Sequence, residues 1–436
     1  MRVALILAVI VSPVLADVPA PVTDADYLPV NEAEARLGHL LFYDPVLSGN
    51  RNISCATCHH PRFATSDGLS LGLGEGGVGL GPDRRADPEN MPEQRIPRNA
   101  PALFNLGARE FTVLFHDGRI ETDPTHPSGL RTPLEDEMVM GFVSVLSAQT
   151  MFPVLSPDEM AGHYQENDVA KAVRSGRITG SGGAWDIITK RVEAIPVYRE
   201  MFSDTYPEIA AGRRIAFTDI SNAIAAFIEF EWRADNSAFD QMLRGGEALS
   251  PESVEGMMLF YGDAGCALCH SGPFQTDQGF HAMGEPQIGP GKAERFENHS
   301  RDIGRMRVTN RKEDAYAFRT PSLRNVMRTG PWGHAGAWSD IRAFLAHHSD
   351  PAAGLSNYTR DQAVLPVLDR TKPDWVILDN ANEAAAIEAA ARQGQRLSDA
   401  DIDALVAFLD ALTDNGAIAG RLGVPDTVPS GLPVDR

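Results

Sequence analysis

The four cysteines of this chain lie in two copies of one short pattern, C-x-x-C-H, and none is left over. The two copies are Cys55, Cys58 and His59, and Cys266, Cys269 and His270. In this pattern the two thiols bind one haem covalently, and the adjacent histidine coordinates its iron. Two short-loop disulfides or one four-cysteine zinc site would also use four cysteines, but neither requires a histidine after each pair. The sequence therefore predicts two covalently bound haem c groups.

Composition and charge narrow the class of protein further. A chain of 436 residues predicts two or three domains. Its 43% hydrophobic and 22% charged residues are typical of globular proteins. The 59 acidic residues outnumber the 39 basic ones, and the formal net charge is −20. Because this charge repels phosphate backbones and anionic membranes, we expect no nucleic-acid ligand.

The first sixteen residues have the pattern of a secretory signal peptide. Arg2 precedes an apolar run from Ala4 to Leu15, and the small residue Ala16 follows it. This run is shorter than the roughly 20 apolar residues that a transmembrane helix needs, and no second run of that length occurs. We therefore expect cleavage after Ala16 and an exported protein with no membrane span.

Helix signals precede each haem motif. Asn31 can cap a helix whose leucines share one face, and Ser250 with the proline after it can open a second helix. A third apolar stripe follows Ser398; it suits a helix that closes over the second haem and equally a plain core helix. Strand signals are few, and 39 glycines with 30 prolines predict long loops. We expect a mainly α fold.

Residues 219–232 form a further amphipathic stretch, and the Arg-Gly-Gly run at residues 244–246 marks the boundary between two modules. The expected organisation is a signal peptide at residues 1–16, an N-terminal haem domain at 17–244 and a C-terminal haem domain at 245–436. Both domains are predicted to be cytochrome c-like, of class I.

Several other segments resemble the bacterial di-haem cytochrome c peroxidases and their MauG-type relatives, in the same order. These segments are 41–44 (LFYD), 98–101 (RNAP), 117–119 (DGR), 320–326 (TPSLRNV), 331–336 (PWGHAG) and 405–409 (LVAFL). The resemblance covers nearly all of the expected mature chain. It implies a periplasmic protein in which the N-terminal haem meets hydrogen peroxide and the C-terminal haem stores and relays electrons.

The resemblance places Glu159 over the open face of the first haem, with Gln149 beside it. Peroxide cleavage needs a group that takes a proton from one oxygen and returns it to the other, which a carboxylate in an apolar pocket can do. Gln149 can hold the peroxide without titrating. Without the resemblance, Glu159 would be an ordinary carboxylate at a helix start. The ten-residue spacing from Gln149 to Glu159 matches the family and favours the catalytic role.

The chain departs from the family first around the peroxide-binding haem. Many members carry a histidine that caps this iron until the other haem is reduced, but no histidine occurs between His60 and His116. This absence predicts an open first haem. The Gly-rich residues 71–77 in the same interval lack the lysine of a phosphate loop, and we interpret them as a flexible loop. We interpret His60 as a surface or propionate-facing residue.

The second departure is His116, which stands where the family has a tryptophan between the haems. His116 is therefore the candidate electron relay, although imidazole is much harder to oxidise than indole and a packed structural histidine fits equally well.

The third departure concerns the distal ligand of the second haem, which is Met or Tyr in the relatives. Counting fourteen residues from His334 gives His348. His347 is the alternative and would point about 100° away on the same helix. If both histidines instead end a solvated helix, Met283 or Met306 would cap the iron.

The resemblance also implies a calcium ion between the domains. Asn99 matches the side-chain ligand, and Thr329 and Pro331 match positions that lend backbone carbonyl groups. Such hard oxygen donors suit calcium. From the residues alone, Asn99 would be a simple loop residue.

The sequence thus predicts a periplasmic di-haem c peroxidase that reduces hydrogen peroxide to water. The expected electron donor is a small redox protein, either a c-type cytochrome or a cupredoxin. One alternative is a MauG-type oxidase that modifies Trp or Tyr of a substrate protein, which the missing capping histidine favours. The other is a non-enzymatic di-haem electron-transfer cytochrome, which would not need Gln149 and Glu159. Both a monomer and a homodimer stay open.

Overall fold

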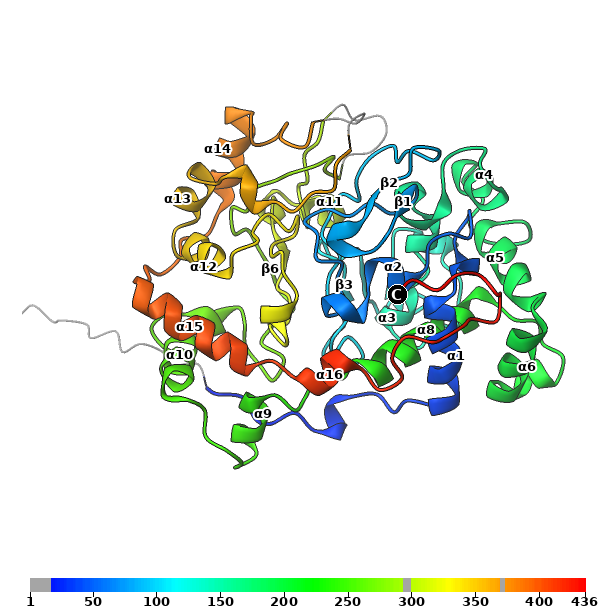
Figure 1. Ribbon diagram of the computed structural model, residues 1–436, viewed down its shortest axis with the longest axis horizontal. Coiled ribbons are helices and arrows are strands. Elements are labelled where there is room, and N and C mark those ends of the chain that lie inside the picture. Colours follow the sequence, from blue (N-terminus) through cyan, green and yellow to red (C-terminus); the bar gives the residue numbers. More distant parts are fainter. Residues whose placement is uncertain (1–16, 293–298, 369–372) are drawn as a thin grey trace, which may run out of the picture.

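The computed structural model describes residues 17–292, 299–368 and 373–436. The described chain is mainly helical with a few very short strands, as the sequence predicts, and Figure 1 shows two groups of helices side by side. The helices of the first group are α1 (Glu32–Tyr43), α2 (Cys55–Cys58), α3 (Val145–Gln149), α4 (Asp168–Arg174), α5 (Ala184–Glu193), α6 (Pro196–Thr205), α7 (Pro207–Ala210) and α8 (Phe217–Glu231). The later helices are α9 (Ala238–Leu243), α10 (Pro251–Tyr261), α11 (Met306–Thr309), α12 (Ile341–Ser349), α13 (Pro351–Ser356), α14 (Ala381–Ala390), α15 (Asp399–Ala411) and α16 (Asn415–Ala419).

The strands pair only locally and always antiparallel. They are β1 (Gly77–Val78) with β2 (Arg85–Ala86), β3 (Val113–Leu114) with β4 (Ile120–Thr122) and β5 (Leu130–Arg131), and β6 (Phe280–His281) with β7 (Phe318–Arg319). Long loops connect these elements, in agreement with the abundance of glycine and proline. No helix in the described ranges is both long and apolar enough to cross a membrane.

The predicted helix starts are confirmed by their caps. The Asn31 side chain accepts a hydrogen bond from the backbone N of Ala33 at 2.9 Å at the start of α1. Ser250 caps α10 in the same way, and Ser398 caps α15.

Each haem motif follows a helix that crosses a partner helix at backbone contact distance. α1 packs against α8, and α10 packs against α15. At the first crossing a Cβ atom on Gly38 would lie 1.7 Å from the carbonyl oxygen of Ala223, and at the second a Cβ on Gly256 would lie 1.9 Å from that of Ala404. Only glycine permits such an approach, so the same crossing is built twice.

The aromatic residues around the two crossings repeat as well. Four residues after each glycine stands a phenylalanine, Phe42 or Phe260, and four residues after each contacted alanine stands another, Phe227 or Phe408. The ring centroids are 5.2 Å apart in the first pair and 5.1 Å apart in the second. These buried rings form the centres of two separate hydrophobic clusters, one in each half of the molecule.

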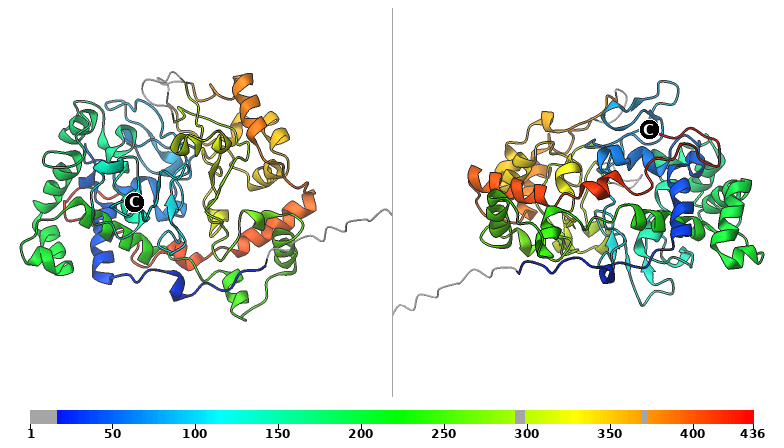
Figure 2. Two further views of the ribbon diagram at one scale, coloured as in Figure 1. Left: turned by 180° about the vertical axis from the view of Figure 1, so that it is seen from behind. Right: turned by 60° about the horizontal axis from the view of Figure 1, so that its bottom comes forward.

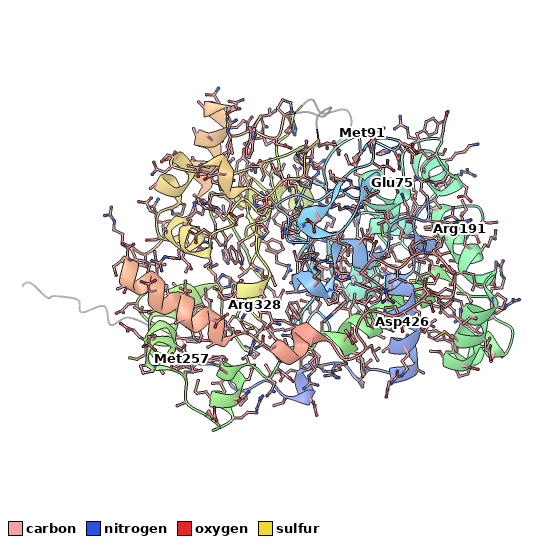
Figure 3. All side chains as sticks on the ribbon, in the orientation of Figure 1. Glu75, Met91, Arg191, Met257, Arg328 and Asp426 are labelled. Atoms are coloured by element: carbon pink, nitrogen blue, oxygen red, sulfur yellow. The ribbon has the colours of Figure 1, made fainter. Side chains whose placement is uncertain are left out.

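The C-terminal tail, residues 420–436, leaves the second half and runs along the first (Figure 1), which the views in Figure 2 confirm. Figure 3 labels Asp426 of this tail close to the helices of the first half, and Met257 on α10 in the second half. The buried carboxylate of Glu231 accepts hydrogen bonds from the backbone N of Leu422 at 2.7 Å and of Gly423 at 2.9 Å. The tail therefore completes the first half, while the proposed boundary near residue 244 stays a prediction.

Replacing Gly38 by alanine should loosen the first crossing. The added methyl group would meet the backbone of α8, and overpacking of this kind costs about 1–3 kcal/mol. We expect a lower midpoint of thermal unfolding, measured by circular dichroism on the haem-loaded protein. Gly416→Ala in α16 is the control, because its Cβ would come no closer than 3.2 Å, to the Asp414 carboxylate. Equal midpoints for the Gly38 variant and the wild type would contradict the close crossing.

Candidate functional site

The first haem motif forms the short helix α2 and the residue after it. Its histidine, His59, donates a hydrogen bond from Nδ1 to the carbonyl oxygen of Thr65 at 3.0 Å. Burial lowers the pKa of His59, so the ring is neutral and its other nitrogen, Nε2, keeps a lone pair. Burial also raises the pKa of both thiols, Cys55 and Cys58, to about 12. This donor set fits a haem bound by two thioethers and one imidazole.

The second motif repeats this arrangement on the 3-10 turn Cys266–Leu268. His270 donates from Nδ1 to the carbonyl oxygen of Gln275 at 3.1 Å. Burial, together with the nearby His348, lowers the pKa of His270 to about 4, which again leaves a neutral ring. All four cysteines are free of disulfides.

Cys269 also lies near Asp277 and His281, with the three ligand atoms within 4.8 Å of one another. A thioether bond to haem would use this cysteine, so the cluster needs no separate metal ion.

His348 lies on α12, close enough to His270 to lower the pKa of that histidine. Its Nδ1 donates to the carbonyl oxygen of Phe344 at 3.0 Å, which leaves Nε2 as the nitrogen that can bind a metal. The neighbouring His347 is buried against Trp338, with ring centroids 5.1 Å apart, and against the backbone of Gly354. These contacts favour His348 over His347 as the second axial ligand.

Glu159 lies on the single π-helical turn Pro157–Ala161 rather than at the start of a regular helix. Burial raises the pKa of its carboxyl group, whereas the positive charges of Lys292 and Arg119 lower it. Gln149 ends α3, and its Oε1 atom is buried without a hydrogen-bond partner. A part-buried carboxyl group with a raised pKa and an unpartnered amide oxygen are groups suited to handling a small polar substrate.

The interpretation of residues 71–77 as a flexible loop is wrong, because the whole segment is buried. A Cβ on Gly74 would lie 2.8 Å from the Cα of Glu159, and the backbone N of Glu75 donates to the carbonyl oxygen of Asp158 at 3.0 Å. The glycines allow this backbone to pack directly on the turn that carries Glu159. The segment therefore supports the candidate catalytic residue.

His60 is buried, so a surface position is wrong, whereas the propionate-facing position stays a prediction. Its Nδ1 accepts a hydrogen bond from the backbone N of Arg62 at 3.1 Å, and its Nε2 has no protein partner. Beside it, the hydroxyl group of Thr57 in the first haem motif donates to the carboxylate of Asp435 in the tail. The C-terminal tail thus reaches the first haem motif, which no sequence signal indicated.

His116 lies at the junction of the two halves, where its carbonyl oxygen accepts a hydrogen bond from the backbone N of Arg319 at 2.8 Å. Burial lowers the pKa of its imidazole to about 3, and the charges of Arg98 and His334 act in the same direction. A neutral imidazole between the halves is compatible with both interpretations of His116, an electron relay and a packed structural histidine.

A buried ion-pair network spans the same junction. Arg98 from the first half donates two hydrogen bonds to Asp302 from the second half, at 2.8 and 2.9 Å, and lies 3.1 Å from Asp117. The guanidinium group holds the pKa of both carboxyl groups far below the usual range. Arg305 crosses in the other direction to the Glu121 carboxylate at 2.8 Å. Arg98 lies in the RNAP segment that resembles the family, but no sequence pattern indicated its partner Asp302.

A stacked pair of rings lies next to this network. Phe318 and His334 have centroids 3.7 Å apart with an interplanar angle of 9°. The His334 Nδ1 donates to the part-buried carboxylate of Glu285 at 3.0 Å, and this hydrogen bond, together with the electrostatic effect of His334, lowers the pKa of Glu285 to about 2. Sequence reasoning missed Glu285 because it has no partner nearby in the chain.

Asn99 also lies where the halves meet. Its side-chain amide donates to the carbonyl oxygen of Leu69 at 2.8 Å, and its backbone N donates to that of His334 at 3.0 Å. The other two residues of the expected calcium site, Thr329 and Pro331, precede His334 in the same loop, where Thr329 Oγ1 donates to the carbonyl oxygen of Val326. The amide oxygen of Asn99 is thus near this loop, and the calcium site stays a prediction.

Comparison with known proteins finds similarity to di-haem peroxidases and MauG proteins by family model, by sequence and by fold. A family model described as di-haem cytochrome c peroxidase matches residues 32–248. The methylamine utilization protein MauG of Methylorubrum extorquens is 29% identical over 323 residues, covering 73% of this chain and 69% of that protein. Cytochrome c551 peroxidase of Pseudomonas aeruginosa is 26% identical over 330 residues, covering 76% of this chain and 75% of that protein. The diheme peroxidase BthA of Burkholderia thailandensis has the same fold, with a TM-score of 0.59 and 20% identity over 97% of both chains.

We expect His348→Ala to change the ligation of the second haem. Loss of one imidazole should remove a bis-imidazole spectrum, read from the near-infrared charge-transfer band of the oxidised protein. His347→Ala is the matched control and should keep that band. An unchanged band in His348→Ala, or a methionine-type band in the wild type, would exclude His348 as the ligand.

Proposed function

The chain belongs to the di-haem cytochrome c peroxidase family, and we propose that it reduces hydrogen peroxide to water at the first haem with electrons that enter through the second. The observation that carries this proposal is the part-buried Glu159, whose pKa is raised by desolvation, in a chain that also buries an unpartnered Gln149 oxygen. A protein that only carries electrons has no use for these groups.

The haem iron held by His59 supplies the site that binds peroxide and exchanges electrons with it. The chain's own part is proton movement. Gln149 Oε1 accepts a hydrogen bond from the peroxide, and the Glu159 carboxylate takes a proton from one oxygen and gives it to the other. The charges of Lys292 and Arg119 favour the carboxylate form of Glu159 and so oppose the effect of burial. Two protons and two electrons per peroxide yield two waters.

We assign one cytochrome c-like haem domain to each helix crossing, with residues 17–244 and 245–436 as their ranges; the tail of the second range, residues 420–436, packs on the first domain. The support is the repeated crossing at Gly38 and Gly256, each followed by one C-x-x-C-H motif. Both haems are proposed to be covalently attached. A calcium ion held by Asn99, Thr329 and Pro331 would connect the domains.

The electron donor is proposed to be a small redox protein that binds near the second haem motif. Leu268, between the two cysteines of this motif, is 70% exposed, and Met258 on α10 is 68% exposed. The exposed acidic residues Glu252 and Glu255 lie on the same helix. An apolar surface bordered by acidic groups favours a partner whose own apolar face is bordered by basic groups. Export to the periplasm rests on residues 1–16, which lie outside the described residues.

A MauG-type oxidation of Trp or Tyr in a substrate protein is the second candidate function. The specific observation in its favour is the absence of any histidine between His60 and His116 that could cap the first iron. His116 in place of the inter-haem tryptophan distinguishes this chain from both groups.

Glu159→Gln should lower peroxide turnover by about 100-fold or more, because the variant keeps size and polarity but cannot move a proton. Gln149→Leu should lower peroxide turnover by a smaller factor. The readout is steady-state oxidation of reduced cytochrome c, with haem content checked by absorbance. The control is Glu137→Gln, an exposed residue. Near-normal turnover in Glu159→Gln would assign proton transfer to another group.

The oxidised protein should react with peroxide without prior reduction, because no histidine is placed to cap the first iron. Its resting spectrum should then show one high-spin and one low-spin haem, and peroxide titration should change both. Two low-spin haems and a reaction that requires one-electron reduction would contradict this prediction. Turnover with reduced cytochrome c also separates a peroxidase from a pure electron carrier, which should show none.

A further inference from the structure

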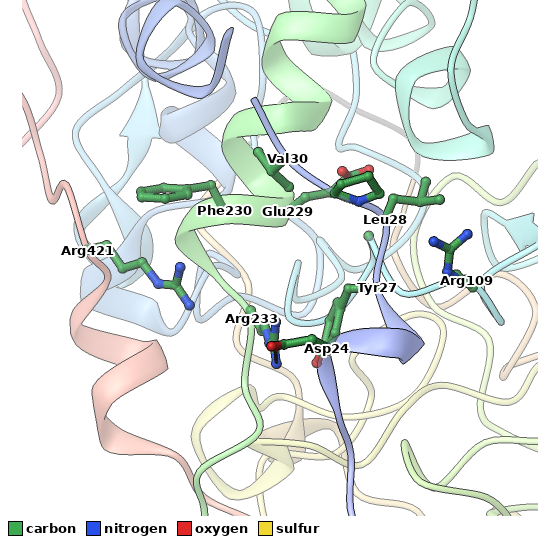
Figure 4. A pocket seen from close by; sticks show the side chains of 11 residues that line it. Asp24, Tyr27, Leu28, Val30, Arg109, Glu229, Phe230, Arg233 and Arg421 are labelled. Atoms are coloured by element: carbon green, nitrogen blue, oxygen red, sulfur yellow. Dashed lines mark ion pairs between the residues drawn. The ribbon is translucent and has the colours of Figure 1, made fainter. Parts of the chain in front are cut away.

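A cavity of about 440 Å³ lies on the first half of the molecule, away from both haem motifs in sequence (Figure 4). Four chain segments line it: residues 24–30, the loop at 107–109, the end of α8 with Arg233 just beyond it, and the start of the C-terminal tail. None of these residues belongs to the groups assigned above to peroxide chemistry, haem attachment or calcium. The cavity is notable for three arginines, Arg109, Arg233 and Arg421.

The backbone on either side of Arg421 determines where its side chain lies. Leu422 is tied to the buried Glu231 carboxylate, and a Cβ on Gly420 would lie 2.3 Å from the same carboxylate. The guanidinium group of Arg421 lies over the Phe230 ring, 5.0 Å from its centroid. Among the ion pairs of the described ranges, none includes Arg421. This cation is therefore positioned at the cavity with its charge unneutralised.

Arg109 is held by the backbone rather than by an acid. Its Nε donates to the carbonyl oxygen of Ala25 at 3.1 Å, and its backbone N donates to that of Asp26 at 2.8 Å. It too has no carboxylate partner within the part of the chain that the structure describes. Its terminal guanidinium nitrogens are thus free to bind an anion.

Arg233 differs because it already has partners. It lies 2.8 Å from Asp24 and 2.6 Å from Asp235, and it stacks on the Tyr27 ring at 4.1 Å from the centroid. These contacts occupy the guanidinium group of Arg233 and hold its side chain in place at the edge of the cavity. Because Arg233 pairs with two carboxylates, this group adds no positive charge to the cavity, whose unpaired cations are Arg109 and Arg421.

Glu229 completes the polar lining. A Cβ on Gly107 would lie 2.0 Å from its Cγ, so only a glycine at 107 lets this side chain lie where it does. One of its carboxyl oxygens is buried without a hydrogen-bond partner. Burial raises its pKa to about 8, with the charge of Glu34 adding to the rise. A carboxyl group that keeps its proton is a hydrogen-bond donor and does not repel an anion.

The remaining walls are apolar and come from Leu28, Val30 and Phe230. Figure 4 shows Arg421 and Arg109 at opposite sides of the cavity, with these apolar groups between them. We propose that the cavity binds a small organic dianion, with one carboxylate on Arg421, one on Arg109 and an aliphatic chain between them. Guanidinium groups are the usual partners of carboxylates, since paired N–H donors match the two oxygens.

Binding here would have a structural consequence for the first haem motif. The dianion would connect the tail, through Arg421, to the loop at 107–109, which Arg109 ties to the backbone of the N-terminal segment at Ala25 and Asp26. The same tail continues to Asp435, which accepts the hydrogen bond of Thr57 between the two haem-binding cysteines. Occupancy should therefore hold the tail more firmly on the first half, and this effect does not depend on the reaction that the haems catalyse.

Isothermal titration of the haem-loaded protein with adipate tests the proposal. We expect one saturable site with a dissociation constant below about 1 mM, and a higher midpoint of thermal unfolding in adipate. Adipamide, the uncharged analogue, should not bind. Arg421→Gln should weaken adipate binding at least about tenfold, and Arg421→Lys should restore part of it.

Arg436→Gln is the matched control. It removes the same charge from the same tail, but Arg436 pairs with Asp426 at 2.9 Å and does not line the cavity. Its adipate affinity should equal that of the wild type. The proposal is overturned if adipate shows no saturable binding, if adipamide binds equally well, or if the Arg436 and Arg421 variants lose affinity to the same extent. If Arg421→Gln does not fold, Arg109→Gln takes its place with the same expected loss.

Discussion

Backbone contact between two crossing helices is the constraint on which both halves of this molecule depend. Gly38 and Gly256 let one helix lie directly on the carbonyl oxygens of its partner, and the phenylalanines four residues later fill the space beside the contact. The haem motif follows this crossing along the chain in each half. The crossing thus fixes where each pair of cysteines and its histidine begin, and any residue larger than glycine would force the helices apart.

Charge determines how the halves meet. Burying Arg98 is expensive unless carboxylates surround it, and Asp302 and Asp117 satisfy it from opposite sides of the junction. Separating the halves would leave the buried Asp302 without its cation, so the network specifies one relative position. The C-terminal tail adds a second connection, because Asp435 reaches the first haem motif after the chain has completed the second half.

Sequence reasoning recovered the features whose signals are local. The helix caps at Asn31, Ser250 and Ser398 were confirmed because capping depends on residues a few positions apart. It was wrong for residues 71–77, because glycine signals backbone freedom in the chain but, in the fold, permits close packing against the turn of Glu159. It was also wrong in allowing His60 a surface position, since the neighbours that bury this side chain are not visible in its local pattern.

The sequence by itself determined the haem motifs, the family, the mainly helical fold and the candidate pair Gln149 and Glu159, since all of these depend on residue types at short or family-wide spacings. Only the tertiary structure decided which polar groups meet across the chain. The pairing of Arg98 with Asp302, the bond between Glu285 and His334, and the contact between the tail and Thr57 join residues far apart in sequence. Such pairs produce no periodic or local pattern in the sequence. Each polar group needs its partner only after folding has removed it from water.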